Sequence, residues 1–231
     1  MKTVSIALSL LSGLLMAAGH GQQVRVSVQY VELSHADVTS LLAEGPAGGS
    51  LHGKVMELVR ANKARILETC IGVCQSGGKA TFESIREEIY PTETQPPPLE
   101  FSIGSSVPRS SQEPHYSLRQ RAFTAFETRN SGTMLDLDAN VLKDGRFVHL
   151  RLAPEIVSRN RLETMVEYRD KRGDASVRMP IYETWRTNTS LTLRSGSFAL
   201  VSAIHPKRPQ PAPFVDSRIL LFVRADVLET Q

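Results

Sequence analysis

The chain has 231 residues, of which 41% are hydrophobic, 22% charged and 6% aromatic. This is ordinary globular composition, and it excludes collagen-like, mucin-like and wholly disordered chains. The formal charge of +3 comes from 27 basic and 24 acidic residues, and the excess is spread along the chain. We therefore predict no nucleic-acid partner, because such binding needs basic residues clustered on one face or in one segment.

The first 21 residues predict a secretory signal peptide. Lys2 gives a positive start, residues 4–18 form an apolar stretch without charge, and small residues follow at Gly19 and Gly21. The stretch is shorter than the roughly 20 residues that a membrane-spanning helix needs. We expect cleavage between Gly19 and Gln22, at a bond the pattern does not specify. An N-terminal anchor helix or a buried helix is the alternative.

Residues 22–50 are expected to hold a leading strand and a short helix. Apolar residues alternate with polar ones from Val24 to Tyr30, which is typical of a half-buried strand. A turn-rich patch occupies residues 44–50. Beyond it, Leu51 and Val55 begin a set of apolar residues at helical spacing, which predicts an amphipathic helix ending near Asn62.

Residues 51–231 are expected to form one β-rich domain with antiparallel hairpins. Alternating or β-branched residues predict strands at residues 65–73, 79–90, 118–127, 133–142, 146–157, 162–168, 182–193, 197–204 and 219–227. Residues 75–78 predict a hairpin turn, and Asp144-Gly145 and Ser195-Gly196 predict tight turns between successive strands. The predicted fold class is mainly β with one or two helices (α+β).

Two proline-rich segments predict loops. Residues 91–114 contain six prolines, which lack the amide donor that a central strand needs. A short strand at residues 99–103 is expected within this loop. Residues 205–213 form the second loop.

No motif for catalysis, cofactor binding or metal binding is present, so we predict no catalytic, cofactor-binding or metal-binding residues and no enzymatic activity. The histidines lie far apart in sequence, at His20, His35, His52, His115, His149 and His205. Three aromatic residues are interpreted as packing residues, namely Trp185, Tyr182 and Phe147.

Residues 136–140 resemble the start of a calcium loop. The pattern fails at Val141, where the loop needs glycine, and at Phe147, where it needs a closing glutamate. We expect instead solvent-facing acids on a strand whose inward residues are Leu135, Leu137 and Ala139.

Cys70 and Cys74 are too few for a disulfide framework. On one strand, the four-residue spacing spans roughly 13 Å, whereas a disulfide needs Cα atoms within about 7 Å. Buried thiols are therefore expected, with a disulfide between subunits as the alternative.

Several segments, taken in order, resemble the core of the secretin family. The first runs from the amphipathic helix through the 75–78 turn to Tyr90-Pro91-Thr92. Next come the alternating strand around Gly132 and the Asp144-Gly145 turn, whose following strand ends in Pro154-Glu155. Finally, residues 180–197 are similar to the family's hairpin entering a glycine turn, and residues 218–223 to its closing strand. The resemblance covers residues 51–228.

This resemblance implies a β-rich homo-oligomer of the bacterial outer membrane, since secretins form rings that act as export channels for secretion systems, pili and phage. Pairing the open sheet edges of neighbouring subunits into a closed ring would remove those edges. The chain departs from the family in three places. Only residues 22–50 precede the core, residues 205–216 replace a Pro-Leu-Gly-rich stretch, and Arg224-Ala225 replaces a Thr-Pro pair.

The leading hypothesis is therefore an exported, reduced secretin-like structural protein of an outer-membrane secretion or pilus-type complex. Its expected partners are further copies of itself or other subunits of the complex, with contact to the outer membrane. Its expected location is the outer membrane or periplasm of a Gram-negative-type bacterium. A monomeric periplasmic binding or scaffold module without pore activity is the alternative, and a degenerate enzyme is the third.

Overall fold

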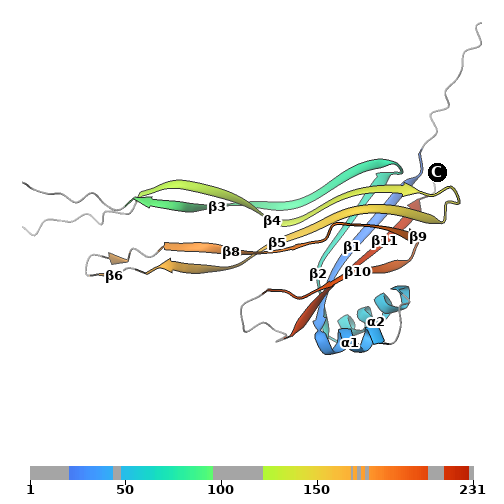
Figure 1. The fold of residues 1–231 in the computed structure, drawn as a ribbon, viewed down its shortest axis with the longest axis horizontal. Coiled ribbons are helices and arrows are strands. Elements are labelled where there is room, and N and C mark those ends of the chain that lie inside the picture. Colours follow the sequence, from blue (N-terminus) through green and yellow to red (C-terminus); the bar gives the residue numbers. More distant parts are fainter. Residues whose placement is uncertain are drawn as a thin grey trace, which may run out of the picture.

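Most of the chain forms antiparallel strands (Figure 1). The computed structural model describes residues 21–43, 48–95, 122–167, 169–170, 173–174, 177–207 and 216–228. The elements are β1 (Gln23–Ser34), α1 (His35–Ala43), α2 (Gly48–Arg60), β2 (Ala64–Gln75), β3 (Gly78–Gln95), β4 (Ala122–Val141), β5 (Phe147–Val166), β6 (Arg169–Asp170), β7 (Gly173–Asp174), β8 (Val177–Arg186), β9 (Thr189–Arg194), β10 (Phe198–Ile204) and β11 (Ser217–Leu228). The fold class is thus mainly β with two helices, which confirms the prediction.

The strands form two main sheets, here called sheet A and sheet B. Sheet A has the order β10-β11-β1-β2. Sheet B has the order β3-β4-β5-β8, and β9 pairs with β5 beside β8. Strands β6 and β7 pair with each other and, within the described ranges, with no further strand. All pairings between the described strands are antiparallel.

Sheet A is the middle layer and buries side chains on both faces. One face packs on sheet B, through Val24 to Tyr30 of β1 and Leu135 and Leu150 of sheet B. The other face packs on the helices, through Phe222 of β11 and Val55 of α2. Strand β11 is covered on both faces, and its sequence is accordingly a nearly continuous run of apolar residues, most of them buried.

The leading strand and the helices lie close to their predicted positions, but α2 begins at Gly48, within the predicted turn-rich patch at residues 44–50. β1 extends the predicted strand to Ser34, and its residues Val31 and Leu33 pack on the helices because they alternate with Val24 to Tyr30, which face sheet B. Helix α2 ends at Arg60. Asn62 follows with a positive φ of 57°, and its amide donates to the carbonyl of Val59, as in a left-handed helix cap.

The turn at residues 75–78 is not the predicted hairpin, because β2 and β3 belong to different sheets. The amide of Ser76 donates to the carbonyl of Gln22, which directly precedes β1 of sheet A. The amide of Gly77 donates to the carbonyl of Ala139 on β4 of sheet B. The Ser195-Gly196 turn works in the same way. Its amides donate to Arg146, next to β5, and to Ala225 of β11. Each Ser-Gly pair therefore carries the chain from one sheet to the other.

Several predicted strand boundaries are wrong. The strands predicted on either side of residues 128–132 form one strand, β4, and those on either side of residues 158–161 form one strand, β5. The single strand predicted at residues 182–193 is instead divided into β8 and β9. Pro154 explains the division. It pairs with Leu135 of β4, but on the other edge of β5 it lies between Leu152, the last partner of β9, and Glu155, the first partner of β8, where no ladder needs its missing amide.

The predicted loop at residues 91–114 begins later than expected, because β3 continues through Pro91 to Gln95. Strand β3 is an edge strand, so a residue without an amide donor is tolerated there, and the ladder shifts register just after it. The predicted strand at residues 99–103 and residues 1–20 of the predicted signal peptide lie outside the described residues. Among the described helices, none has the length and apolar character needed to cross a membrane.

Candidate assembly interface

Sheet B divides into two hairpins that extend away from the rest of the molecule (Figure 1). Strands β4 and β5 pair with each other only as far as Gly132 and Val157. Beyond that point β4 pairs only with β3, and β5 only with β8. We call residues 85–95, 122–131, 158–166 and 177–182 the arm, and the remaining described residues the body.

Gly132 lies at the point where the arm begins. Its φ is 132°, a backbone conformation that side chains disfavour. A Cβ atom there would overlap the carbonyl oxygen of Ser84 on β3. Glycine therefore permits the close approach of β3 and β4 at the position where the sheet splits.

The outer edges of sheet B carry no partner strand among the described residues. β3 pairs only with β4 along its 18 residues, and β8 pairs only with β5 along its 10 residues. Long unpaired edges are templates for pairing with another chain. These two edges are the part of the fold best suited to joining one subunit to the next.

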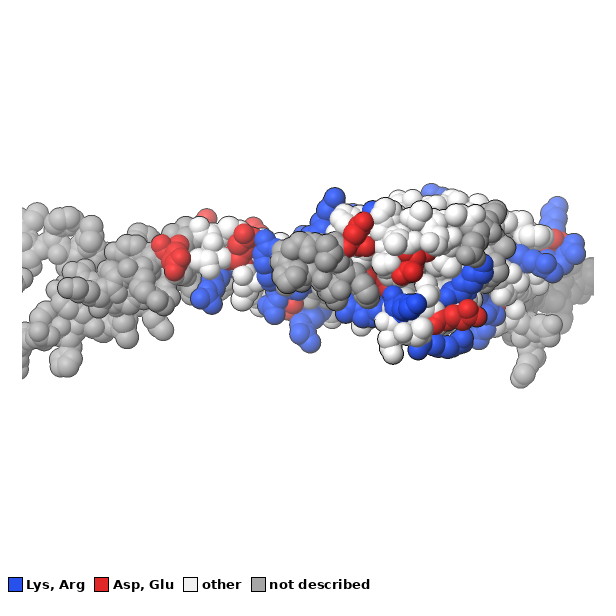
Figure 2. Space-filling view, turned by 90° about the horizontal axis from the view of Figure 1, so that it is seen from below, with Lys and Arg blue, Asp and Glu red and all other residues white. Residues whose placement is uncertain are grey.

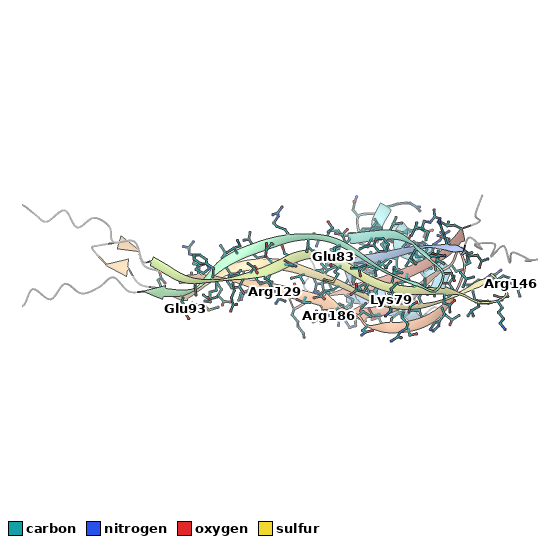
Figure 3. All side chains as sticks on the ribbon, turned by 90° about the horizontal axis from the view of Figure 1, so that it is seen from above. Lys79, Glu83, Glu93, Arg129, Arg146 and Arg186 are labelled. Atoms are coloured by element: carbon teal, nitrogen blue, oxygen red, sulfur yellow. The ribbon has the colours of Figure 1, made fainter. Side chains whose placement is uncertain are left out.

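The polarity of the sheet faces reverses between body and arm. In the body, the inner face of β3 contributes Phe82 to the core, and its outer face carries Lys79 and Glu83. In the arm, the outer face carries Ile85 and Ile89, which are 43% and 67% exposed. The exposed Phe126 of β4 pairs with Pro91 on this same face. Figure 3 shows Lys79 in the body and Arg129 within the arm.

The two hairpins of the arm are held together by side chains rather than by a strand ladder. Glu88 of β3 lies 3.4 Å from the Arg159 guanidinium of β5, and it accepts a hydrogen bond of 3.2 Å from the Tyr182 hydroxyl of β8. The rings of Tyr90 and Tyr182 are 6.1 Å apart, and the Arg129 guanidinium lies 5.4 Å from the Tyr182 ring centre. We call these five residues the clasp.

Partial burial and neighbouring carboxylates both raise the pKa values of the two clasp tyrosines. Burial has the largest effect on the pKa of Tyr90 and raises it, and the neighbouring Glu127 raises it further. Burial, followed by Glu88, raises the pKa of Tyr182. Both hydroxyls therefore stay protonated and donate to carboxylates, at Glu127 and Glu88 respectively. The clasp is an internal polar contact in an otherwise exposed region.

The interpretation of the aromatic residues is correct for Trp185 and wrong for Phe147. Trp185 is 8% exposed in the core, and its indole nitrogen donates to Glu183. Tyr182 is half-buried in the clasp. Phe147 is 37% exposed, because it is the first residue of β5 and points away from the core.

The acids of the calcium-like segment lie where the strand interpretation puts them. Leu135, Leu137 and Ala139 are buried, and the intervening Asp136 is exposed and accepts a hydrogen bond from Thr81. Across the described ranges, no group of three or more metal-ligating side chains occurs.

Both cysteines lie on β2 as free thiols, Cys70 half-buried and Cys74 buried. Burial raises the pKa of both thiols, with smaller contributions from Glu68 at Cys70 and from Asp138 at Cys74. The prediction that they do not bridge each other is confirmed.

Sequence reasoning did not identify the clasp. Glu88 is separated from Arg159 and Tyr182 by 71 and 94 positions in the sequence, and none of these residues belongs to a recognisable motif. The segment 85–91 reads Ile-Arg-Glu-Glu-Ile-Tyr-Pro, without regular alternation of charged and apolar residues, so no local pattern indicates these contacts.

No protein-family model matches this chain, and no curated protein matches it. Among solved structures, it is similar to the Salmonella SPI-1 type III secretion injectisome secretin InvG, with a TM-score of 0.47, 11% identity and coverage of 91% of this chain and 66% of that one. It is also similar to Aeromonas hydrophila ExeD, with a TM-score of 0.45, 13% identity and coverage of 91% and 49%. It is also similar to the type II secretion system secretin GspD of E. coli K12, with a TM-score of 0.43, 13% identity and coverage of 91% of this chain and 51% of that one.

This chain thus spans between about half and two thirds of the length of those proteins. Two of them are described as secretins, the family that the sequence motifs resemble. At TM-scores below 0.5, these similarities do not establish the family, the activity or the partners of this chain.

Proposed function

We propose that this protein is an exported, non-enzymatic structural subunit that assembles with further copies of itself into a secretin-like ring of an outer-membrane secretion complex. The observation that carries the proposal is the pair of sheet B edges, β3 and β8, which have no partner strand among the described residues and lie in an arm whose described side chains form no buried cluster. Joining β3 of one copy to the β8 side of the next would pair both edges and close the ring. The motifs that resemble the secretin core support the same assignment.

Export is proposed from residues 1–21, which carry the pattern of a cleaved signal peptide. Location at the outer membrane is supported by the apolar face of the arm, where Ile85 and Ile89 are exposed. That face needs either a neighbouring subunit or an apolar surface to cover it.

The test is blue-native electrophoresis of the full chain, expressed with its own first 21 residues in a Gram-negative host, from separated periplasmic and membrane fractions. We expect high-mass assemblies in the membrane fraction in mild detergent. A soluble periplasmic species of about 23–24 kDa, the mass left after signal removal, would favour the monomeric binding module instead.

Two double variants locate the interface. Ile85→Lys/Ile89→Lys places charges beside the β3 edge and should abolish the assemblies, because charged edge strands resist pairing. Leu42→Lys/Leu142→Lys changes two residues of similar exposure on α1 and at the β4–β5 turn, and it should leave them intact. Equal assembly by both variants would exclude β3 as the joining edge.

A further inference from the structure

A cavity of about 340 Å³ lies between the two hairpins of the arm, next to the clasp. It is open to solvent on one side and is lined by β3, β5 and β8, so residues from distant parts of the sequence form its walls. This volume falls at the lower end of the range of small-molecule sites in proteins. The walls come from a single chain, although Ile89 of the proposed ring interface is among the lining residues.

The cavity has a basic side. Arg86, Arg159 and Arg178 line it, and Glu88 is the one carboxylate among the lining residues. Glu88 is already paired with Arg159 and hydrogen-bonded to Tyr182. Within the part of the chain that the structure describes, neither Arg86 nor Arg178 forms an ion pair, so these two guanidinium groups carry the positive charge of the cavity wall. Figure 2 shows basic side chains gathered where the arm meets the body.

The cavity also has an apolar side. Leu162, which is 56% exposed, and Pro180 line it from β5 and β8, where they are cross-strand partners. The hydroxyls of Tyr90 and Tyr182 are committed to Glu127 and Glu88, so these residues present their rings to a ligand. A ligand that satisfies both sides must carry an anionic group next to an apolar part.

We infer that this cavity binds an amphipathic phosphate, with the phosphate held by Arg86 and Arg178 and an apolar chain lying against Leu162 and Pro180. Guanidinium groups bind phosphate oxygens through paired, charge-assisted hydrogen bonds. This favours a phosphate over an uncharged ligand group with a single acceptor atom. The phosphate can belong to a lipid headgroup at a bilayer surface or to a single soluble molecule. The inference goes beyond the proposed ring and concerns a ligand of the individual chain.

The test uses the purified full-length mature chain with three probes: dihexanoyl phosphatidylglycerol, inorganic phosphate, and vesicles of phosphatidylglycerol or phosphatidylcholine. Calorimetric titration should detect binding of the soluble lipid, with weaker binding of inorganic phosphate. Arg86→Gln/Arg178→Gln should weaken lipid binding roughly tenfold or more, because charge-assisted hydrogen bonds are lost. Leu162→Ser should weaken binding of the lipid and leave that of inorganic phosphate unchanged.

The matched control is Arg146→Gln/Arg151→Gln, which removes the same charge from exposed positions away from the cavity. Arg146 lies at the opposite end of the molecule from the arm (Figure 3). Arg86→Lys/Arg178→Lys keeps the charge and removes the paired hydrogen bonds, and circular dichroism confirms that each variant is folded.

Equal loss of binding in the cavity and control variants would overturn the site, because attraction would then follow net charge alone. Inorganic phosphate binding as tightly as the lipid would overturn the apolar part, and no binding of any probe would overturn the whole inference. Vesicle binding that depends on Arg86 and Arg178, without binding of the soluble lipid, would assign the phosphate to a bilayer surface. Binding of the soluble lipid without vesicle binding would assign it to a single molecule.

Discussion

Strands β3, β4, β5 and β8 run through both the body and the arm, but the two regions are stabilised in different ways. In the body, sheet A is buried between sheet B and the helices, and side chains such as Phe222 and Leu135 are fully enclosed. In the arm, the same sheet B continues as two hairpins whose apolar residues, including Ile89, are largely exposed. Strand pairing alone therefore does not distinguish the stable region from the region that needs a partner.

The difference has a physical cause. A two-stranded hairpin is marginally stable in water, and strands gain stability when a face is covered by another layer. The clasp supplies one partly exposed ion pair and a few ring contacts, and exposed ion pairs contribute little. The body is thus expected to fold by itself, and the arm to become firmly ordered when a neighbouring subunit or a ligand covers it.

The largest effect should come from the body core. Phe222→Ala removes a fully buried ring between β11 and the helices, and should lower the free energy of unfolding by about 3–5 kcal/mol. Urea denaturation of the monomer measures it. A loss below about 1 kcal/mol would mean that the helix layer does not support the body.

Gly132→Ala tests the boundary between the two regions. Its Cβ would overlap the Ser84 carbonyl, and its φ of 132° is unfavourable for alanine. We expect a loss of about 1–3 kcal/mol, together with faster amide exchange in β3 beyond Ser84. Gly53→Ala is the control, because a Cβ there meets no atom within 4 Å. Unchanged amide exchange in β3 would show that the separation of the two hairpins does not depend on this glycine.

Tyr30→Phe should leave the body unchanged or more stable. Tyr30 is 2% exposed, and its hydroxyl has no hydrogen-bond partner among the described residues. Burying an unpaired hydroxyl is costly, so its removal should raise the free energy of unfolding by up to about 1–2 kcal/mol. Thermal unfolding at neutral pH measures this. A clear loss of stability would reveal a hydrogen bond to the hydroxyl.

Asp226 makes the stability of the body sensitive to acid. Burial by itself would raise the pKa of this carboxyl, but hydrogen bonds from Arg224 and Arg25 outweigh burial and hold the pKa below its ordinary value. A lowered pKa gives stability that is present above the unfolded-state value of about 3.9 and is lost as the pH falls through the lower folded-state value.

We therefore expect the melting temperature of the wild type to fall more steeply than that of Asp226→Asn below about pH 4. Asp144→Asn serves as the control, since Asp144 is a more exposed turn residue. Parallel curves for the wild type and Asp226→Asn would contradict the role of Asp226.

The smallest effect is expected in the arm. Ile89→Ser removes a side chain that is 67% exposed, so the free energy of unfolding of the monomer should change by less than about 0.5 kcal/mol. The same variant should weaken assembly in native electrophoresis. A loss in the monomer as large as that of Phe222→Ala would show that the arm has a core of its own.

Local patterns predicted many of the elements but not their boundaries. The alternation from Val24 to Tyr30 and the helical spacing from Leu51 correspond to β1 and α2. The merging of predicted strands into β4 and β5 could not be predicted, because polar residues such as Asn130 occur inside strands that extend into solvent. Pro91 was interpreted as a strand breaker, since its place on an edge strand depends on a distant neighbour.

The candidate interface was only partly accessible from the sequence. The resemblance to secretins led to the expectation of open edges, but it did not identify which strands carry them. Glu88, Arg159 and Tyr182 come from three strands, and their contact follows from the way the two hairpins lie against each other. The cavity beside them has the same origin, and no local pattern encodes it.

By itself, the sequence determined the β-rich class, most of the helical residues and the inward face of Leu135, Leu137 and Ala139, while export stays a prediction. These features depend on neighbouring residues and on periodicities of two or 3.6 residues. Only the tertiary structure decided that the Ser76-Gly77 and Ser195-Gly196 turns join different sheets and that β4 and β5 part at Gly132. Each of these depends on hydrogen bonds or packing between segments far apart in the chain.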